Sequence, residues 1–177
     1  MIETERLILR QWRDSDRAPF HAMSCDPKVM ATLGPLQTRA QSDAAIDSQI
    51  AVQARLGHCF WAIERCDDAA FLGFCGLKIA PDAIPGIEGA IEIGWRLRRD
   101  AWGVGYAREA AAASLDWGFA NLADDRIIAI TTPGNTRSWG LMERLGMVRR
   151  SDLDFAHPGL AADDPLSPHI TYEAHRR

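Results

Sequence analysis

The spacing of apolar residues changes several times along the chain, and each change predicts a new element. Residues 6–10 carry a short apolar run that predicts a first strand, and residues 14–16 supply capping side chains for a helix that reaches about Ser24. Residues 38–41 read T-x-x-Q, which fits the capping box of a second helix that ends at Gly57. The N-terminal third is therefore expected to fold as one strand followed by two helices.

The middle of the chain holds short apolar runs that are typical of strands. Three of them, at residues 59–65, 71–79 and 90–97, are separated by polar or Pro/Gly-containing turns. This arrangement predicts an antiparallel meander. An alanine-rich helix follows and reaches about Leu122, and its small residues allow close packing against a sheet.

The C-terminal third alternates between strand and helix patterns. Residues 126–132 are apolar and β-branched, which predicts a central strand, and residues 135–145 predict a short helix that ends at Gly146. Two last strands are expected at residues 147–155 and near residues 169–174. The resulting order, β-α-α-β-β-β-α-β-α-β-β, predicts an α/β fold with a mixed, mostly antiparallel central sheet flanked by helices.

Length and composition predict one globular domain over residues 1–177, with 47% hydrophobic and 25% charged residues. No apolar run approaches the roughly 20 residues of a membrane span, and the polar N-terminal stretch predicts no secretory signal. The net charge of −4 argues against a nucleic-acid partner and suits an amine substrate. We therefore expect a cytoplasmic protein with no membrane or nucleic-acid partner.

The four cysteines show no C-x-x-C spacing, and three of them fall in predicted strands. Buried thiols are therefore expected rather than disulfides, and no histidine or cysteine spacing predicts a metal site.

The most informative local pattern is a Gly-x-Gly loop that follows a predicted strand and opens a helix. Gly103 and Gly105 have no side chains to hold a ligand away from the backbone. Several N–H groups can then converge on an anion, and the positive end of the helix dipole adds to the attraction. The loop is a predicted phosphate cradle.

Two common phosphate-binding motifs do not fit this loop. A P-loop requires Gly-Lys-Ser/Thr, but Tyr106 and Ala107 follow the second glycine. A dinucleotide fingerprint requires a third glycine where Arg108 stands, and a meander before the loop conflicts with a β-α-β start.

The loop is similar to the acyl-CoA loop of the GNAT superfamily of N-acetyltransferases, whose pattern is Gln/Arg-x-x-Gly-x-Gly/Ala. Here residues 100–105 read D-A-W-G-V-G, so an aspartate stands at the first position. Arg98 and Arg99, just before it, are candidates to supply the missing positive charge. Trp102, inside the loop, is expected near the ligand or in loop packing.

A second segment, residues 135–147, resembles the N-x-x-S-x-x-x-x-x-K-x-G-F segment of the same family. Arg144 and Met147 are mild substitutions within it. The resemblance covers essentially the whole chain, and the branch that it resembles most is the RimJ/RimL type, which is named for acetylation of ribosomal-protein N-termini.

The resemblance implies acetyl-CoA as co-substrate. It assigns the pyrophosphate to the amides of residues 103–107 and the pantetheine arm to main-chain groups of a strand that splays from its neighbour. The residues assigned to the cofactor are Trp95, Arg96, Leu97, Arg98, Gly103, Val104, Gly105, Tyr106, Ala107, Asn135, Ser138 and Met142.

Glu92 is the first candidate for a general base or water-positioning residue. Strand alternation places Glu92 and Arg96 on one face, opposite an apolar face, so the acid is expected to be partly buried with a raised pKa. The alternative is a structural carboxylate that pairs with Arg96 or another arginine. Glu92 is also a candidate substrate-binding residue.

Many members of the family protonate the leaving thiolate with a tyrosine, but the matching residue here is Met142. Ser138 is then a candidate donor to the sulfur, or a helix serine that bonds back to the chain. Asn135 is a candidate to reach pantetheine or a water, or it is only the N-cap of its helix. Glu92, Ser138 and Asn135 are thus the predicted catalytic residues.

Asp154 and His157 are candidates to line the acceptor cleft, although both residues can equally pin their loop to the sheet. The predicted reaction is acetyl transfer to a primary amine by direct attack in a ternary complex. The acceptor is a protein N-terminal α-amine or a small-molecule amine, and a homodimer is possible. The alternative is a GNAT-fold protein that binds acyl-CoA without turnover.

Overall fold

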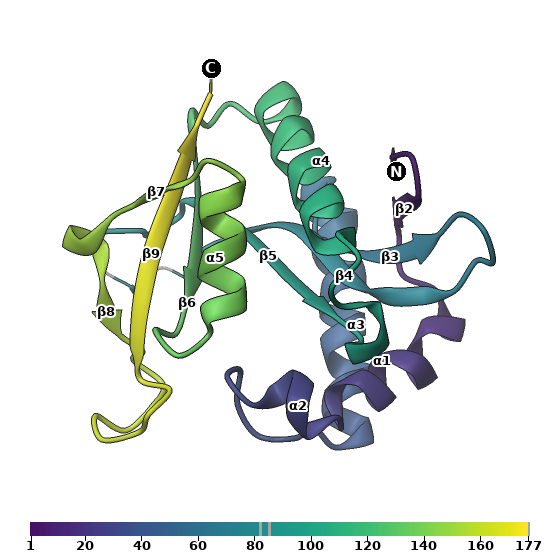
Figure 1. The fold of residues 1–177 in the computed structure, drawn as a ribbon, viewed down its shortest axis with the longest axis horizontal. Coiled ribbons are helices and arrows are strands. Elements are labelled where there is room, and N and C mark those ends of the chain that lie inside the picture. Colours follow the sequence, from purple (N-terminus) through teal and green to yellow (C-terminus); the bar gives the residue numbers. More distant parts are fainter. Residues whose placement is uncertain (82, 85, 177) are drawn as a thin grey trace.

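The structure is a computed structural model that describes residues 1–81, 83–84 and 86–176 (Figure 1). The strands in this part of the chain form one sheet in the order β1-β2-β3-β4-β5-β6-β9-β7, with β8 paired to β9. Their bounds are β1 (Ile2–Glu3), β2 (Leu7–Arg10), β3 (Phe60–Arg65), β4 (Phe71–Ile79), β5 (Ile91–Leu97), β6 (Arg126–Thr131), β7 (Val148–Arg149), β8 (Phe155–Ala156) and β9 (Pro168–His175). The α-helices are α1 (Arg17–Ser24), α2 (Pro27–Met30), α3 (Arg39–Leu56), α4 (Tyr106–Asn121) and α5 (Thr136–Arg144).

The predicted fold class is confirmed. β3, β4 and β5 form the antiparallel meander, whereas β5 and β6 are parallel neighbours. The capping box is present at the start of α3, where the side chain of Thr38 accepts from the N–H of Gln41, and Gly57 ends that helix at a φ of 77°. None of the helices in the described ranges combines the length and apolarity that a membrane span requires.

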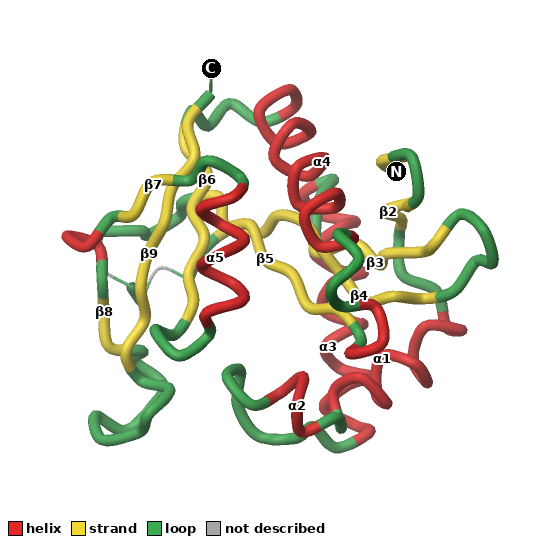
Figure 2. The backbone as a smooth tube through the Cα atoms, in the orientation of Figure 1, coloured by secondary structure: helices red, strands yellow, loops and turns green. Residues whose placement is uncertain are grey.

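The prediction of one continuous strand at residues 147–155 is wrong. This segment is divided into β7, a 3-10 turn at Ser151–Leu153, and β8 (Figure 2). Arg150 stands at this break and donates hydrogen bonds both to Asp152 within the turn and to Glu173 of β9. These contacts close the turn where a continuous strand was expected. The short elements β1 and α2 were not predicted.

The central feature of the sheet is that β5 and β6 remain paired over only two positions. Ile91 lies beside Ile127 and Glu92 lies beside Ile128, after which the two strands diverge. Figure 1 shows the opening between them, with α4 on one side of it and α5 along the other. The remaining length of β5, up to Leu97, therefore has a free edge.

Helix α4 packs closely against one face of the sheet. Ala110 and Ala111 are fully buried, and a Cβ added to Gly118 would lie 2.7 Å from Leu77 of β4 and 2.8 Å from Ile127 of β6. Small residues thus set the short distance between this helix and the strands on both sides of the opening.

The opposite face of the meander carries α1, with α3 packed on that helix. Phe20 of α1 lies 6.3 Å from Phe74 of β4, measured between ring centroids. Phe74 is directly opposite Arg96 of β5. Because alternate residues of a strand share a face, Glu92 lies on this same face as Arg96.

Gly73 of β4 fixes the position of the diverging part of β5. A Cβ added to Gly73 would lie 2.1 Å from the carbonyl oxygen of Arg96, and the residue has a φ of 142°. We predict that Gly73→Ala lowers the free energy of unfolding by at least about 2 kcal/mol, since backbone atoms must move to accept the methyl group. Urea denaturation measures the loss.

The matched control is Gly57→Ala, which is also strained at a φ of 77° but meets no atom within 4 Å. This substitution should lower the free energy of unfolding by about 1 kcal/mol. Equal losses of unfolding free energy in the two variants would show that the close approach of β4 to β5 adds nothing to the cost of Gly73→Ala.

Candidate active site

The free edge of β5 exposes main-chain groups into the opening. Arg98 donates its N–H to the carbonyl of Leu72 in β4 at 2.8 Å, so the main chain of Arg98 faces β4. Successive residues of a strand alternate between its two edges. The N–H and C=O groups of Trp95 and Leu97 therefore face the opening, where the indole of Trp102 already donates to the Leu97 carbonyl at 2.9 Å.

The loop after β5 has the geometry of an anion cradle. Gly103 and Gly105 have φ values of 80° and 90°, and Gly105 is the N-cap of the 16-residue helix α4. A Cβ at Gly103 would meet no atom within 4 Å. Within the described chain, the N–H groups of residues 103–108 have no hydrogen-bond acceptor, and the first N–H that is satisfied belongs to Glu109. The bare amides stand at the positive end of a helix dipole.

An ion-pair cluster from the N-terminus holds this loop in place. Arg6 donates to the carbonyl of Val104 at 3.0 Å, and its guanidinium lies 4.8 Å from the ring centroid of Tyr106. Glu109 accepts hydrogen bonds from Thr4 and from the main chain and side chain of Arg6. Partial burial raises the pKa of Glu109, but these hydrogen bonds outweigh it and lower the pKa overall. This cluster cannot be predicted from the sequence, because no local pattern links residues about 100 positions apart.

The side chain of Arg98, one of the two candidates to supply positive charge to the loop, is paired with Asp100. Its guanidinium donates to both carboxylate oxygens of Asp100, at 3.1 and 2.5 Å, and to the carbonyl of Phe71 at 3.1 Å. Asp100 thus neutralises Arg98 instead of leaving it for a ligand. Arg99 is exposed and has no ion pair among the described residues.

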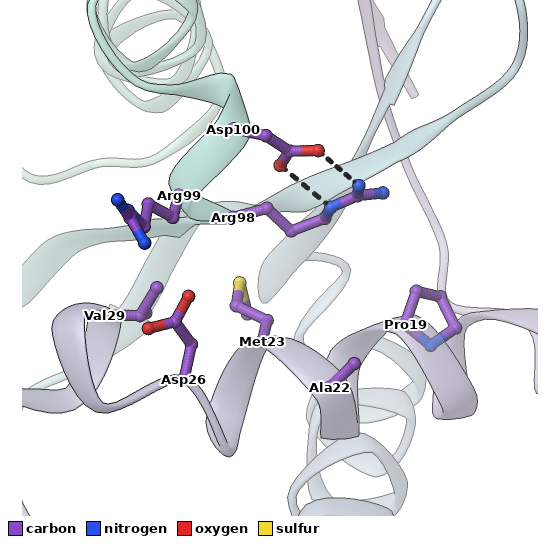
Figure 3. Close-up of a pocket in the computed structure, with 8 residues that line it drawn as sticks. All are labelled: Pro19, Ala22, Met23, Asp26, Val29, Arg98, Arg99 and Asp100. Carbon is purple, nitrogen blue, oxygen red and sulfur yellow. Dashed lines mark hydrogen bonds and ion pairs between the residues drawn. The ribbon is translucent and has the colours of Figure 1, made fainter.

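Beside this pair lies an open hollow of about 770 Å³ between α1, α2 and the start of the loop. Figure 3 shows the Arg98–Asp100 pair at its upper wall, with Arg99 and Asp26 across from each other. The residues that line it are Pro19, Ala22, Met23, Asp26, Val29, Arg98, Arg99 and Asp100. The hollow continues from the C-terminal end of β5 and does not include Glu92.

Trp102 connects the loop to α5 across the opening. The guanidinium of Arg137, in the first turn of α5, lies 4.7 Å from the Trp102 ring centroid. This contact agrees with the expectation of loop packing for Trp102. It also brings one exposed cation, Arg137, to the cradle.

Glu92 is buried, with 6% of its surface exposed, and its partner is Lys78 of β4. Lys78 Nζ lies 3.2 Å from Glu92 Oε2, which is an ion pair, but the oxygen has no aligned hydrogen bond. Burial raises the pKa of Glu92, and the positive charge of Lys78 offsets only part of that effect. The structure therefore gives Glu92 a lysine partner in place of the arginine considered above. Lys78 was not among the predicted residues, because its place opposite Glu92 depends on the register of the β4–β5 pair.

The three site residues predicted at α5 differ in whether they have a polar group free to contact a ligand. The side chain of Asn135 caps the helix by accepting from the N–H of Ser138 at 3.4 Å. The Ser138 hydroxyl makes no hydrogen bond within the described chain, so it does not bond back to its own helix. Met142 is 1% exposed within the main hydrophobic cluster and provides no proton donor.

Asp154 and His157 are both held by structural contacts. Asp154 accepts both guanidinium donors of Arg149 and the N–H of Thr171 at 3.1 Å. His157 Nδ1 accepts from the N–H of Gly159 at 3.1 Å. Asp154 thus ties the loop to β9, whereas the Nδ1 contact of His157 lies within the loop itself and its ring lies 5.3 Å from that of His169 in β9, measured between ring centroids.

The comparisons with known proteins agree with this architecture. A family model described as "Acetyltransferase (GNAT) domain" matches residues 6–148. The uncharacterized protein YkkB of Bacillus subtilis (strain 168) is 34% identical over 147 residues, which cover 82% of this chain and 84% of the relative.

Solved structures show the same fold over nearly the whole chain. An acetyltransferase from Agrobacterium tumefaciens str. C58 superposes with a TM-score of 0.79 at 25% identity, covering 99% of this chain and 94% of the other. Spermidine N-acetyltransferase from Vibrio cholerae, in complex with CoA and spermine, has a TM-score of 0.74 at 15% identity, with coverages of 97% and 96%. RimL, a ribosomal L7/L12 α-N-protein acetyltransferase in complex with coenzyme A, has a TM-score of 0.76 at 15% identity, with coverages of 97% and 95%.

The opened parallel pair, the glycine loop at the start of α4 and the family match over residues 6–148 lead to one conclusion. The chain belongs to the GNAT family of N-acetyltransferases.

Proposed function

We propose that this enzyme transfers the acetyl group of acetyl-CoA to a primary amine by direct attack in a ternary complex. The observation that carries the proposal is the run of unpaired N–H groups at residues 103–108, next to the free edge of β5. Such a run suits a diphosphate, and a free strand edge suits an amide-containing arm that pairs as an extra strand. The two structural relatives in complex with coenzyme A support this assignment.

The residues present fit coenzyme A in the following way. The amides of residues 103–107 would hold the pyrophosphate, and the main chain of Trp95 and Leu97 would pair with the pantetheine arm. The main chains of Arg96 and Arg98 face β4, and the Arg98 side chain is paired with Asp100, so these two predicted residues would border the cofactor without pairing with the pantetheine arm. Asn135 and Ser138 would line the other side of the opening from α5, whereas Met142 is buried within the hydrophobic cluster.

Glu92 acts in this proposal as the base, or as the residue that orders a water that takes the proton. The amine must be neutral before its nitrogen attacks the thioester carbonyl carbon. An α-amine has a pKa near 8 and a lysine amine near 10.4, a difference of about 3 kcal/mol in the cost of deprotonation. Burial of Glu92 brings its pKa closer to that of its proton donor, which makes proton transfer more favourable.

The second proton step concerns the leaving group. When the carbon–sulfur bond breaks, the sulfur carries the negative charge and needs a hydrogen-bond donor or a proton. Because Met142 replaces the tyrosine of many relatives, the free hydroxyl of Ser138 is the proposed donor to the thiolate. Asn135 is proposed to support the same region, because its cap occupies only the side-chain carbonyl oxygen.

The acceptor is proposed to be a protein N-terminal α-amine or a small-molecule amine. Structural relatives named for spermidine and for ribosomal L7/L12 show that the fold serves both kinds of acceptor. Since Asp154 and His157 already have structural partners, we propose for them at most a supporting role at the rim of the acceptor cleft.

An amine panel tests the reaction. Purified protein is incubated with acetyl-CoA and N-terminal peptides, amino acids, polyamines and aminoglycosides, and both thiol release and the acetylated product mass are recorded. We expect amine-dependent thiol release and a matching product for at least one class. Thiol release equal to background hydrolysis across the whole panel would contradict the proposal.

Gly105→Glu tests the cradle. The glutamate adds bulk and negative charge where the diphosphate binds, so we predict at least about a hundredfold loss of coenzyme A affinity in calorimetry. Gly57→Glu is the matched control, since it adds the same charge at an exposed glycine of positive φ that ends α3 and is not part of the loop. Unchanged affinity in Gly105→Glu would place the diphosphate elsewhere.

Glu92→Gln tests the base. We predict that kcat falls at least tenfold while coenzyme A affinity changes less than about twofold. Because a base must be deprotonated, wild-type kcat/KM should rise with pH through an inflection above the usual range of a glutamate pKa. The inflection should be absent from Glu92→Gln and retained in Glu3→Gln, an exposed control. Wild-type turnover in Glu92→Gln would exclude Glu92 as the base.

A further inference from the structure

Arg96 differs from every other arginine of the described chain, because it is partly buried and has no carboxylate partner. Its Nε atom is buried without a hydrogen-bond acceptor. The remaining arginines without an ion pair in the described chain are all exposed, namely Arg55, Arg99, Arg108, Arg137 and Arg144. A guanidinium that keeps its proton is thus partly withdrawn from water, and its Nε donor is left without an acceptor.

The surroundings of Arg96 compensate only part of this cost. Its guanidinium lies 5.5 Å from the ring centroid of Phe74, the residue directly opposite on β4. That contact is a cation–π interaction and satisfies no N–H donor. Burial lowers the pKa of Arg96, and no nearby carboxylate reverses the shift. A buried donor of this kind is stabilised when an oxyanion supplies the missing acceptor, and the remaining N–H groups of the guanidinium can bind the same anion.

Arg96 also lies on the acceptor side of the proposed reaction. It shares a face of β5 with Glu92, and Gly94 lies between them. A Cβ at Gly94 would be 2.7 Å from the ring of Phe60, so Phe60 covers the middle of this strip and stacks against Phe74. The strip thus has a buried acid at one end, aromatic rings in the middle and an unpaired cation at the other end. The two ends are about 13 Å apart along the strand.

We infer that the acceptor amine carries an oxyanion, a carboxylate or a phosphate, and that the guanidinium of Arg96 binds it while the amine points toward Glu92. This inference rests on the proposed function and names its substrate class. The planar fork of arginine matches two oxyanion oxygens at once, which a lysine cannot do. A polyamine would instead place a positive charge next to Arg96, so spermidine-like acceptors are predicted to be poor.

Equilibrium binding tests the inference without requiring turnover. Calorimetry with coenzyme A present compares 6-aminohexanoate and 6-aminohexyl phosphate, two oxyanion-bearing amines, with hexylamine, which has the same chain and no anion. We expect at least tenfold tighter binding of one oxyanion than of hexylamine. The better of the two identifies carboxylate or phosphate as the preferred group.

The preference is then measured in three variants as the ratio of hexylamine to oxyanion dissociation constants, which cancels any effect on coenzyme A. We expect a ratio near one in Arg96→Gln, an intermediate ratio in Arg96→Lys, and the wild-type ratio in Arg55→Gln, which removes an exposed charge. Thermal unfolding verifies that each variant is folded, and Arg96→Lys serves if Arg96→Gln does not fold. Three outcomes would overturn the inference. They are a ratio near one in the wild-type protein, no measurable binding of either oxyanion-bearing amine, and an unchanged ratio in Arg96→Gln.

A turnover measurement on the same amines separates this inference from the proposed function. Discrimination in binding without acetyl transfer would support the oxyanion site and contradict the proposed reaction. Equal acetylation of hexylamine and the oxyanion-bearing amines would support the reaction and overturn the role of Arg96.

Discussion

The divergence of β5 from β6 after Glu92 is the constraint on which the rest of the site depends. Two parallel strands that stayed paired would satisfy each other's main-chain groups and leave no edge for a ligand. Because pairing ends at the Glu92–Ile128 position, the main chain of Trp95 and Leu97 is left facing an opening. The same divergence places the buried carboxylate of Glu92 at the closed end of the opening.

The opening is useful only if the loop at its mouth keeps its amides pointing outward. Arg6 binds the carbonyl of Val104 and is itself held by Glu109 of α4, so the loop is tied to the first turn of that helix. The N-terminal strand thus acts on the site from a distance of about a hundred residues in sequence. Close packing of α4 through alanine and glycine fixes the helix dipole at the same point.

Local signals explain how much of this could be predicted from sequence. The capping box at Thr38, the glycine loop and the strand runs of the meander each depend on neighbouring residues, and the structure contains all of them. The errors come from distant partners. Arg150 breaks the strand predicted at residues 147–155 through contacts to β9, and Lys78, not an arginine, faces Glu92 because of hairpin register. A buried donor without an acceptor, such as Arg96 Nε, can likewise be recognised only once the positions of the strands are known.

The central claim is that unpaired amides of β5 and the glycine loop receive the donor, and amide hydrogen exchange measures this directly. On addition of coenzyme A, the N–H groups of Trp95, Leu97 and residues 103–107 should exchange markedly more slowly, while those of the exposed α3 surface remain unchanged. Exchange at these amides that is indifferent to coenzyme A, with protection gained elsewhere, would contradict the account.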